Sequence, residues 1–162
     1  MSRPAQAGTG MQVLSPVAGR VLALADVPDP VFAQQMVGPG LAVDPEPGEV
    51  LALAPISGHV VSLHPHAFVV VGDRGRGVLV HLGIGTIGLH GDGFTLHVEA
   101  GAEVAAGQPV IGFDTARVVA AGLSAVCPVI ALDADESVLA RPVGAPGPEQ
   151  QVASGDPLLL WS

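Results

Sequence analysis

The chain has 162 residues, a formal net charge of −9 and one cysteine. This length predicts one domain with its own core, and a single cysteine excludes a network of internal disulfides. Aromatic residues make up only 3% of the chain, so few side chains could stack on bases, and the acidic charge disfavours nucleic acid and anionic membranes as partners. A basic protein partner fits this charge better.

The hydrophobic content, 49%, does not indicate a membrane protein. The apolar runs are short and interrupted by Gly, Pro, Asp or His, and none approaches the roughly 18 residues needed to cross a bilayer. Residues 1–6 contain one Arg and no apolar segment of the signal-peptide type. We therefore expect a soluble cytoplasmic protein with no direct membrane insertion.

In chain order, residues 1–10 are small and polar, which predicts a flexible tail ahead of a single domain at 11–162. The pattern at 11–24 predicts strand, turn and strand, and strand signals resume at 40–43.

Two short helices are predicted between the strands. Asp29 can cap the first, with Pro30 at its first position and Gly38 just past its end. The second is expected at 115–121, with Asp114 as its cap and Gly122 ending it. Further strands are expected at 124–131 and 157–161.

Two segments of the chain occur twice. PVAGRVLAL at 16–24 returns 39 residues later as PISGHVVSL at 55–63, and VAAGQPVI at 104–111 returns as VASGDPLL at 152–159. Each copy has a glycine at a turn between two strand-like runs. Together with 22 Gly and 15 Pro, which indicate frequent turns, the repeats predict an all-β sandwich or barrel of pseudo-duplicated halves.

A hairpin is predicted where two apolar β-branched runs, 69–71 and 78–80, flank a Gly-rich connector. A turn centred on Arg74-Gly75 would place His81 opposite Phe68 and diagonal to His66, with all three side chains on one face. Two imidazoles would then lie within reach of one small group. A one-residue bulge in the connector would reverse this parity.

The chain contains six histidines. We expect His59, His90 and His97 to be solvated surface imidazoles. For His66 and His81, two interpretations stay open on spacing alone: a functional pair, or two half-buried rings held by backbone hydrogen bonds.

Several motifs follow one another in a fixed order along the chain. They are PHAF at 65–68, GVLVHLGIGT at 77–86, GDGF at 91–94, and upstream 15–19, 26–33, 37–42 and 54–58. In this order they resemble the glucose-type enzyme IIA domain of the bacterial phosphoenolpyruvate-dependent sugar phosphotransferase system. The resemblance runs from about residue 11 to the C-terminus and implies an antiparallel β-sandwich of duplicated halves.

By this resemblance, His81 would receive a phosphoryl group from the phosphocarrier HPr on a ring nitrogen, and His66 would support that group. The phosphoryl group would then pass to an enzyme IIB cysteine of a sugar permease of glucose, N-acetylglucosamine or glucoside type. A neutral imidazole is a competent nucleophile near pH 7, and this transfer requires no metal. A module that binds regulatory target proteins according to its phosphorylation state is a compatible interpretation.

The resemblance also implies an apolar rim around the histidines that docks the partners. Asp29 matches an acidic rim position facing an Arg of HPr, although helix capping explains it equally well. For Phe68 and Leu82, core packing is at least as good an explanation. The rim positions are Val31, Phe32, Met36, Val37, Leu63, Phe68 and Leu82.

The chain departs from the family pattern at two positions. Gly85 stands where the family has an Asp, which removes a rim carboxylate. His64 replaces a small hydroxyl residue that would orient His66. His64 could take over that hydrogen bond, point to solvent, or supply a third nitrogen to a metal.

An alternative hypothesis is a zinc-dependent hydrolase that uses His64, His66 and His81 as ligands. A zinc ion at the His66–His81 pair alone is also possible. The hydrolase lacks an obvious carboxylate ligand or general base. Cys127 lies in an apolar run, which predicts a buried, inert thiol.

Overall fold

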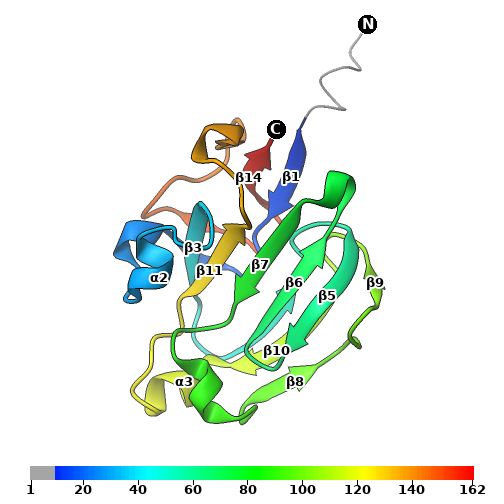
Figure 1. The fold of residues 1–162 in the computed structure, drawn as a ribbon. Helices are drawn as coiled ribbons and strands as arrows, with labels where there is room; N and C mark the ends of the chain where they lie inside the picture. Colours follow the sequence, from blue (N-terminus) through cyan, green and yellow to red (C-terminus); the bar gives the residue numbers. More distant parts are fainter. Residues whose placement is uncertain (1–9) are drawn as a thin grey trace, which may run out of the picture.

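The computed structural model describes residues 10–162 (Figure 1). The tail expected over 1–10 lies, apart from Gly10, outside the described residues. Short strands joined by tight turns dominate the architecture. The strand pairings are antiparallel, which confirms the predicted fold class.

The largest sheet has eight strands in the order β13-β2-β3-β11-β7-β6-β5-β9. Two three-stranded sheets, β4-β10-β8 and β1-β14-β12, complete the sandwich (Figure 1). The bounds are β1 Met11–Leu14, β2 Gly19–Ala23, β3 Gly40–Pro45, β4 Glu49–Leu53, β5 Gly58–His64, β6 Ala67–Val71, β7 Gly77–His81, β8 Phe94–Leu96, β9 Glu103–Val104, β10 Pro109–Asp114, β11 Cys127–Ala131, β12 Leu139–Ala140, β13 Gln151–Val152 and β14 Pro157–Trp161.

The helices are few and short. The Asp29 carboxylate accepts a hydrogen bond from Val31 N at 2.8 Å, so Asp29 caps the first helix as predicted. This helix ends earlier than expected, because Gln35 adopts a left-handed φ of 56°, and Gly38 lies well beyond its end. The bounds are η1 Leu24–Asp26, α2 Pro30–Ala33, η2 Asp73–Gly75, η3 Thr86–Leu89, α3 Thr115–Ala120 and η4 Glu136–Val138.

The second helix, α3, follows its predicted cap. The Asp114 carboxylate accepts from Ala116 N at 2.9 Å. Gly122 follows the helix with a φ of 82°, the left-handed conformation that suits a position after a helix end.

The two copies of the first predicted repeat form equivalent backbone hydrogen bonds with each other. Leu14 N donates to the Pro55 carbonyl at 2.8 Å, and Leu53 N donates to the Pro16 carbonyl at 3.0 Å. These pairs correspond under the 39-residue offset, so two copies of one segment bond each other across a pseudo-twofold axis. The prediction of duplicated halves is therefore confirmed.

The second repeat is built onto the first in the same way in both halves. Gly107 N donates to the Ala54 carbonyl and Gly155 N donates to the Ser15 carbonyl, both at 2.8 Å. Strand β9 pairs with β5, and β13 pairs with β2, at equivalent positions. Each half thus has the same strand–turn–strand frame.

The eight-stranded sheet is covered on both faces at its centre. Val43 and Val129 belong to the main core between the sheets, whereas the next residues in β3 and β11, Ala42 and Ile130, belong to a second apolar cluster. Because neighbouring side chains in a strand point to opposite faces, this second cluster lies on the outer face. It also contains Phe32, so it holds α2 against the sheet.

The two ends of the described chain lie together. Met11 pairs with Trp161 across β1 and β14, and both termini lie at the end of the molecule opposite η3 and α3 (Figure 1). None of the helices in residues 10–162 has the length and apolar character that a membrane span requires.

Candidate active site

His81 is the last residue of β7, and a hydrogen bond fixes its ring. Its Nδ1 lies 2.6 Å from the Gly83 carbonyl oxygen. Because a carbonyl can only accept, Nδ1 carries the hydrogen, and in the neutral ring Nε2 holds the lone pair. The Gly83 carbonyl points back toward the His81 ring because Gly83 adopts a φ of 83°, where a residue with a side chain would be strained.

The loop after His81 is tied down by three hydrogen bonds. Thr86 Oγ1 donates to the Leu82 carbonyl at 2.8 Å, and Ile84 N donates to the Ser124 carbonyl at 2.9 Å. Leu82 N donates to the His66 carbonyl at 2.7 Å. The last bond connects the β5–β6 turn to the end of β7 and brings the His66 backbone to the site.

Four aromatic rings form a continuous row at this site. The Phe32 and His81 ring centroids are 5.2 Å apart, and those of His66 and His81 are also 5.2 Å apart, in an edge-to-face arrangement. His64 extends the row, with its ring centroid 5.8 Å from that of His66. The structure therefore brings together His64, His66 and His81.

The hairpin register differs from the prediction by one residue. His81 pairs with Ala67, and Phe68 pairs with Val80. The connector between Val71 and Gly77 has five residues and is centred on Arg74 instead of on Arg74-Gly75, so the parity is reversed, and Phe68 lies on the core face. His66 still reaches His81, because it lies in the β5–β6 turn, outside the strand alternation.

The local environment keeps both imidazoles neutral near pH 7. Burial lowers the pKa of His81, although the hydrogen bond to Gly83 and the negative charge of Asp29 act in the opposite direction. Burial also lowers the pKa of His66, and positive charge on His81 or His64 lowers it further. A neutral imidazole retains a nucleophilic lone pair.

Only some of the predicted rim residues are exposed to solvent. Val31 and Met36 are 41% and 68% exposed, and Val37, Leu63 and Asp29 are partly exposed.

The assignment of Phe68 and Leu82 to this rim is wrong, because both side chains are completely buried in the main core. Phe32 is 7% exposed and forms a wall against His81. Ile87 of η3, directly after Thr86, was not among the predicted rim residues and is 69% exposed.

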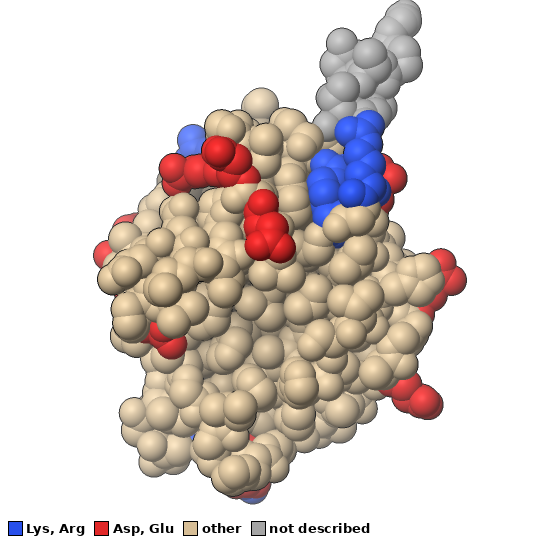
Figure 2. Space-filling model, viewed as in Figure 1, with Lys and Arg blue, Asp and Glu red and all other residues tan. Residues whose placement is uncertain are grey.

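The surface around the site carries little charge. In Figure 2, the area over β5, β6 and β7 is almost free of Lys, Arg, Asp and Glu, which gather along the upper edge and the margins of this face. A protein that covers the histidines from this side would therefore meet mainly uncharged side chains.

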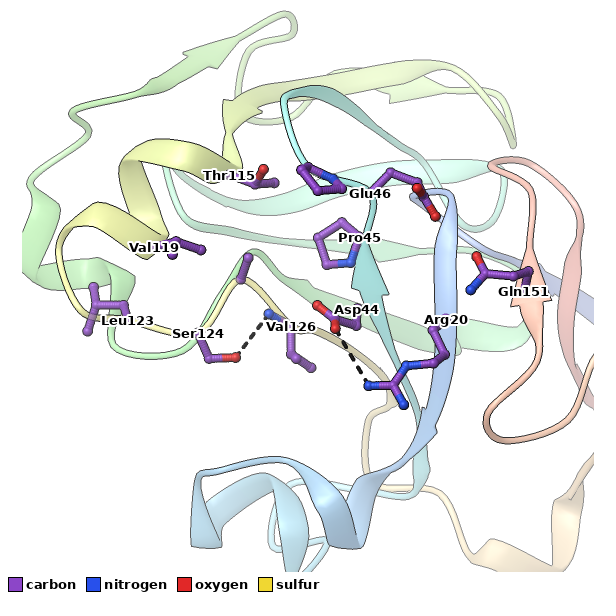
Figure 3. A pocket seen from close by; sticks show the side chains of 12 residues that line it. Arg20, Asp44, Pro45, Glu46, Thr115, Val119, Leu123, Ser124, Val126 and Gln151 are labelled. Atoms are coloured by element: carbon purple, nitrogen blue, oxygen red, sulfur yellow. Dashed lines mark hydrogen bonds and ion pairs between the residues drawn. The ribbon is translucent and has the colours of Figure 1, made fainter.

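A hollow of about 490 Å³ lies between β2, β3, α3 and the segment before β11 (Figure 3). Arg20 of β2 and Asp44 of β3 line it and form an ion pair at 3.8 Å, and Arg20 also pairs with Glu149. None of the histidines lines this hollow. The only cationic side chain among the described residues that line it, Arg20, is already paired with carboxylates, so the candidate chemistry stays at His81.

The arrangement of these side chains gives little support for a metal site. Within residues 10–162, no group of three or more His, Cys, Asp or Glu side chains is arranged to hold a metal ion. The zinc-hydrolase alternative, which needs His64, His66 and His81 as joint ligands, is therefore unsupported. A zinc ion at the His66–His81 pair stays a prediction.

The remaining candidates behave as predicted. Cys127 is completely buried, and burial raises the pKa of its thiol to about 12, so the thiol is inert. His59, His90 and His97 are exposed.

Comparisons with known proteins agree on one family. The family described as "phosphoenolpyruvate-dependent sugar phosphotransferase system, EIIA 1" matches residues 11–137. The chain is 39% identical over 125 residues to the glucose-specific EIIA component of Oceanobacillus iheyensis, covering 76% of this chain and 74% of that protein.

It is also 39% identical over 124 residues to the beta-glucoside-specific EIIBCA component of Bacillus subtilis, which covers 75% of this chain but only 20% of that protein. Among solved structures, glucose permease IIA from Mycoplasma capricolum superposes with a TM-score of 0.82 at 31% identity, covering 93% of this chain and 95% of that one.

Proposed function

Because this chain belongs to the EIIA 1 family of the phosphoenolpyruvate-dependent sugar phosphotransferase system, we propose that it carries phosphoryl groups on His81. It accepts the group from phospho-HPr and passes it to a cysteine of an EIIB domain. The sugar served is of the glucose, N-acetylglucosamine or glucoside type, and the reaction takes place in the cytoplasm.

The observation that carries this proposal is the ring of His81. Its Nδ1–H is engaged by the Gly83 carbonyl, so Nε2 is the nucleophile. The Nε2 lone pair forms a bond to phosphorus while the bond from phosphorus to the carrier breaks, and the carrier leaves with that electron pair. The Gly83 hydrogen bond stays in place, because phosphorylation of Nε2 leaves Nδ1–H unchanged.

His66 supports the transferred group from the other side. Its ring lies edge-on to His81 at 5.2 Å, which leaves room for a phosphoryl oxygen to accept its N–H. Onward transfer reverses the sequence: an EIIB thiolate attacks phosphorus, the N–P bond breaks, and the electron pair returns to Nε2. Neither step needs a metal.

Partners dock through apolar contact around the histidines. Val31, Met36 and Ile87 are the exposed apolar side chains of α2, the turn after it and η3. Asp29 supplies a carboxylate at this margin, suited to an Arg of HPr. Proteins that recognise the phosphorylated or unphosphorylated face would use the same surface, which supports a regulatory role as well.

The test is phosphorylation with phosphoenolpyruvate, enzyme I and HPr. We expect the wild type to gain one acid-labile phosphoryl group by mass spectrometry and His81→Gln to gain none. The matched control, His59→Gln, changes an exposed imidazole near the start of β5, a different strand from that of His81. This variant should be labelled normally. His66→Gln should accept the group but transfer it slowly to EIIB. Normal labelling of His81→Gln would refute the assignment.

A further inference from the structure

The His66 imidazole is held in an unusual way for a residue at a reaction site. Its backbone is fixed, since its carbonyl accepts from Leu82 N. Among residues 10–162, however, no hydrogen bond or ion pair reaches its ring; its recorded ring contacts are with His81 and His64. The torsion that turns a His ring has a broad energy profile, so ring packing decides where His66 points.

His64 supplies the outer half of that packing. It is the last residue of β5 and is exposed, and its ring is tilted by 33° to that of His66. Pro65 between them restricts the backbone, and a Cβ at Gly91 would lie 3.5 Å from the Pro65 ring. The proline thus restricts the backbone of this short turn, and the exposed His64 ring forms the outer end of the row.

This arrangement selects among the roles considered for His64. No hydrogen bond links His64 to His66 within the described chain, so His64 does not replace the missing hydroxyl by the same interaction. Its ring does not point away from the site either, because it lies beside His66. What it offers is an aromatic surface against which His66 stays turned toward His81.

We propose that His64 is a positioning residue that keeps the His66 ring directed at His81 by ring packing, and thereby sets the rate of phosphoryl transfer to EIIB. The proposal rests on the proposed function of His81. The aromatic ring of His64 positions His66, and the nitrogen atoms of that ring are not needed for this role.

Three variants separate ring packing from hydrogen bonding. His64→Ala removes the ring, His64→Gln keeps polar atoms without a ring, and His64→Phe keeps the ring without nitrogen. We expect Ala and Gln to lower kcat for transfer to EIIB about fivefold with KM unchanged, the size of effect that an aromatic pair supports, and Phe to preserve it. His59→Ala, on the same strand, should behave as wild type.

The second readout is the set of nuclear magnetic resonance signals of the His66 ring, which should move or broaden in Ala and Gln but not in Phe. Wild-type kinetics and unchanged His66 signals in His64→Ala would overturn the proposal, and so would rescue by Gln but not by Phe. If the wild type is not phosphorylated on His81, the proposed function fails, while the His66 signals still decide whether His64 holds that ring.

Discussion

Two connections at equivalent places in the duplicated scaffold differ in length and in structure. Strands β2 and β5 begin at matching positions of the repeat, yet β2 leads into η1 and α2 before β3, whereas β5 leads to β6 through Pro65-His66 alone. Both connections reach the same residue: Phe32 from the long one and His66 from the short one each lie 5.2 Å from the His81 ring.

The difference shows how a symmetric frame produces an asymmetric site. Phe32 is buried and apolar, so it removes water from one side of His81. His66 is polar and partly exposed, so it leaves the other side open to an incoming phosphoryl group. The repeated strands form a symmetric frame, and two unlike connections within it supply the two unlike walls of His81.

The largest expected effect comes from removing the apolar wall. Phe32→Ala should lower the free energy of unfolding by about 3 kcal/mol, because a buried ring leaves a cavity. It should also raise the pKa of His81 toward its ordinary value, since burial is the main cause of the lowering. Urea denaturation and imidazole titration by nuclear magnetic resonance measure both.

The polar wall should respond differently. His66→Ala removes a partly exposed side chain that forms no hydrogen bond within residues 10–162, so its cost should stay within about 0.5 kcal/mol, while transfer to EIIB is impaired. Equal losses of stability in Phe32→Ala and His66→Ala would contradict the contrast between the walls.

The frame itself should be equally intolerant in both halves. A Cβ at Gly19 would lie 2.0 Å from the Asp44 carbonyl oxygen, and one at Gly58 would lie 2.1 Å from that of Val71. Both Gly19→Ala and Gly58→Ala should cost about 2 kcal/mol in urea denaturation, because the paired strand must move. Gly88→Ala, with nothing within 4 Å, is the control, and tolerance in one half alone would show that the halves are not equivalent.

A smaller effect separates the two roles of Asp29. Asp29→Asn keeps the helix cap but removes the charge, so the pKa of His81 should fall further with little loss of stability. Asp29→Ala should lower the pKa of His81 in the same direction and also cost about 1 kcal/mol through the lost cap. An unchanged pKa in both variants would show that the carboxylate does not act on His81.

The smallest effect is a pH dependence of stability. The pKa values of His66 and His81 lie below 6.5 in the folded protein, so below pH 6.5 the unfolded chain binds more protons. The free energy of unfolding should be highest above pH 6.5 and fall as the pH decreases toward the folded pKa values. His81→Gln should weaken this fall in urea denaturation, and an unchanged profile would contradict it.

The sequence was sufficient for features that depend on local chemistry. The caps Asp29 and Asp114 and the buried Cys127 follow from residue type and neighbours, and the repeats fixed the duplicated frame. The hairpin register was not predictable from the same information, because whether the connector after Val71 holds an even or an odd number of residues depends on its folded conformation, including a left-handed Arg74.

Whether each rim side chain points to the core or to solvent was also not predictable. Phe68 and Leu82 stand beside the histidines in the chain, but the reversed parity turns Phe68 into the core. Leu82, the residue after His81, also lies in the main core, although His81 does not. The pairing of His66 with His81 was anticipated for an incorrect reason, since a turn residue is not bound by strand alternation.

The pairing of β1 with β14 has a consequence for how this domain can be tethered. With Met11 opposite Trp161 and both termini far from η3 and α3, a polypeptide attached at either end would leave from the same pole, away from the histidines. A linker at either end would therefore join the domain to a larger assembly without covering His66 and His81.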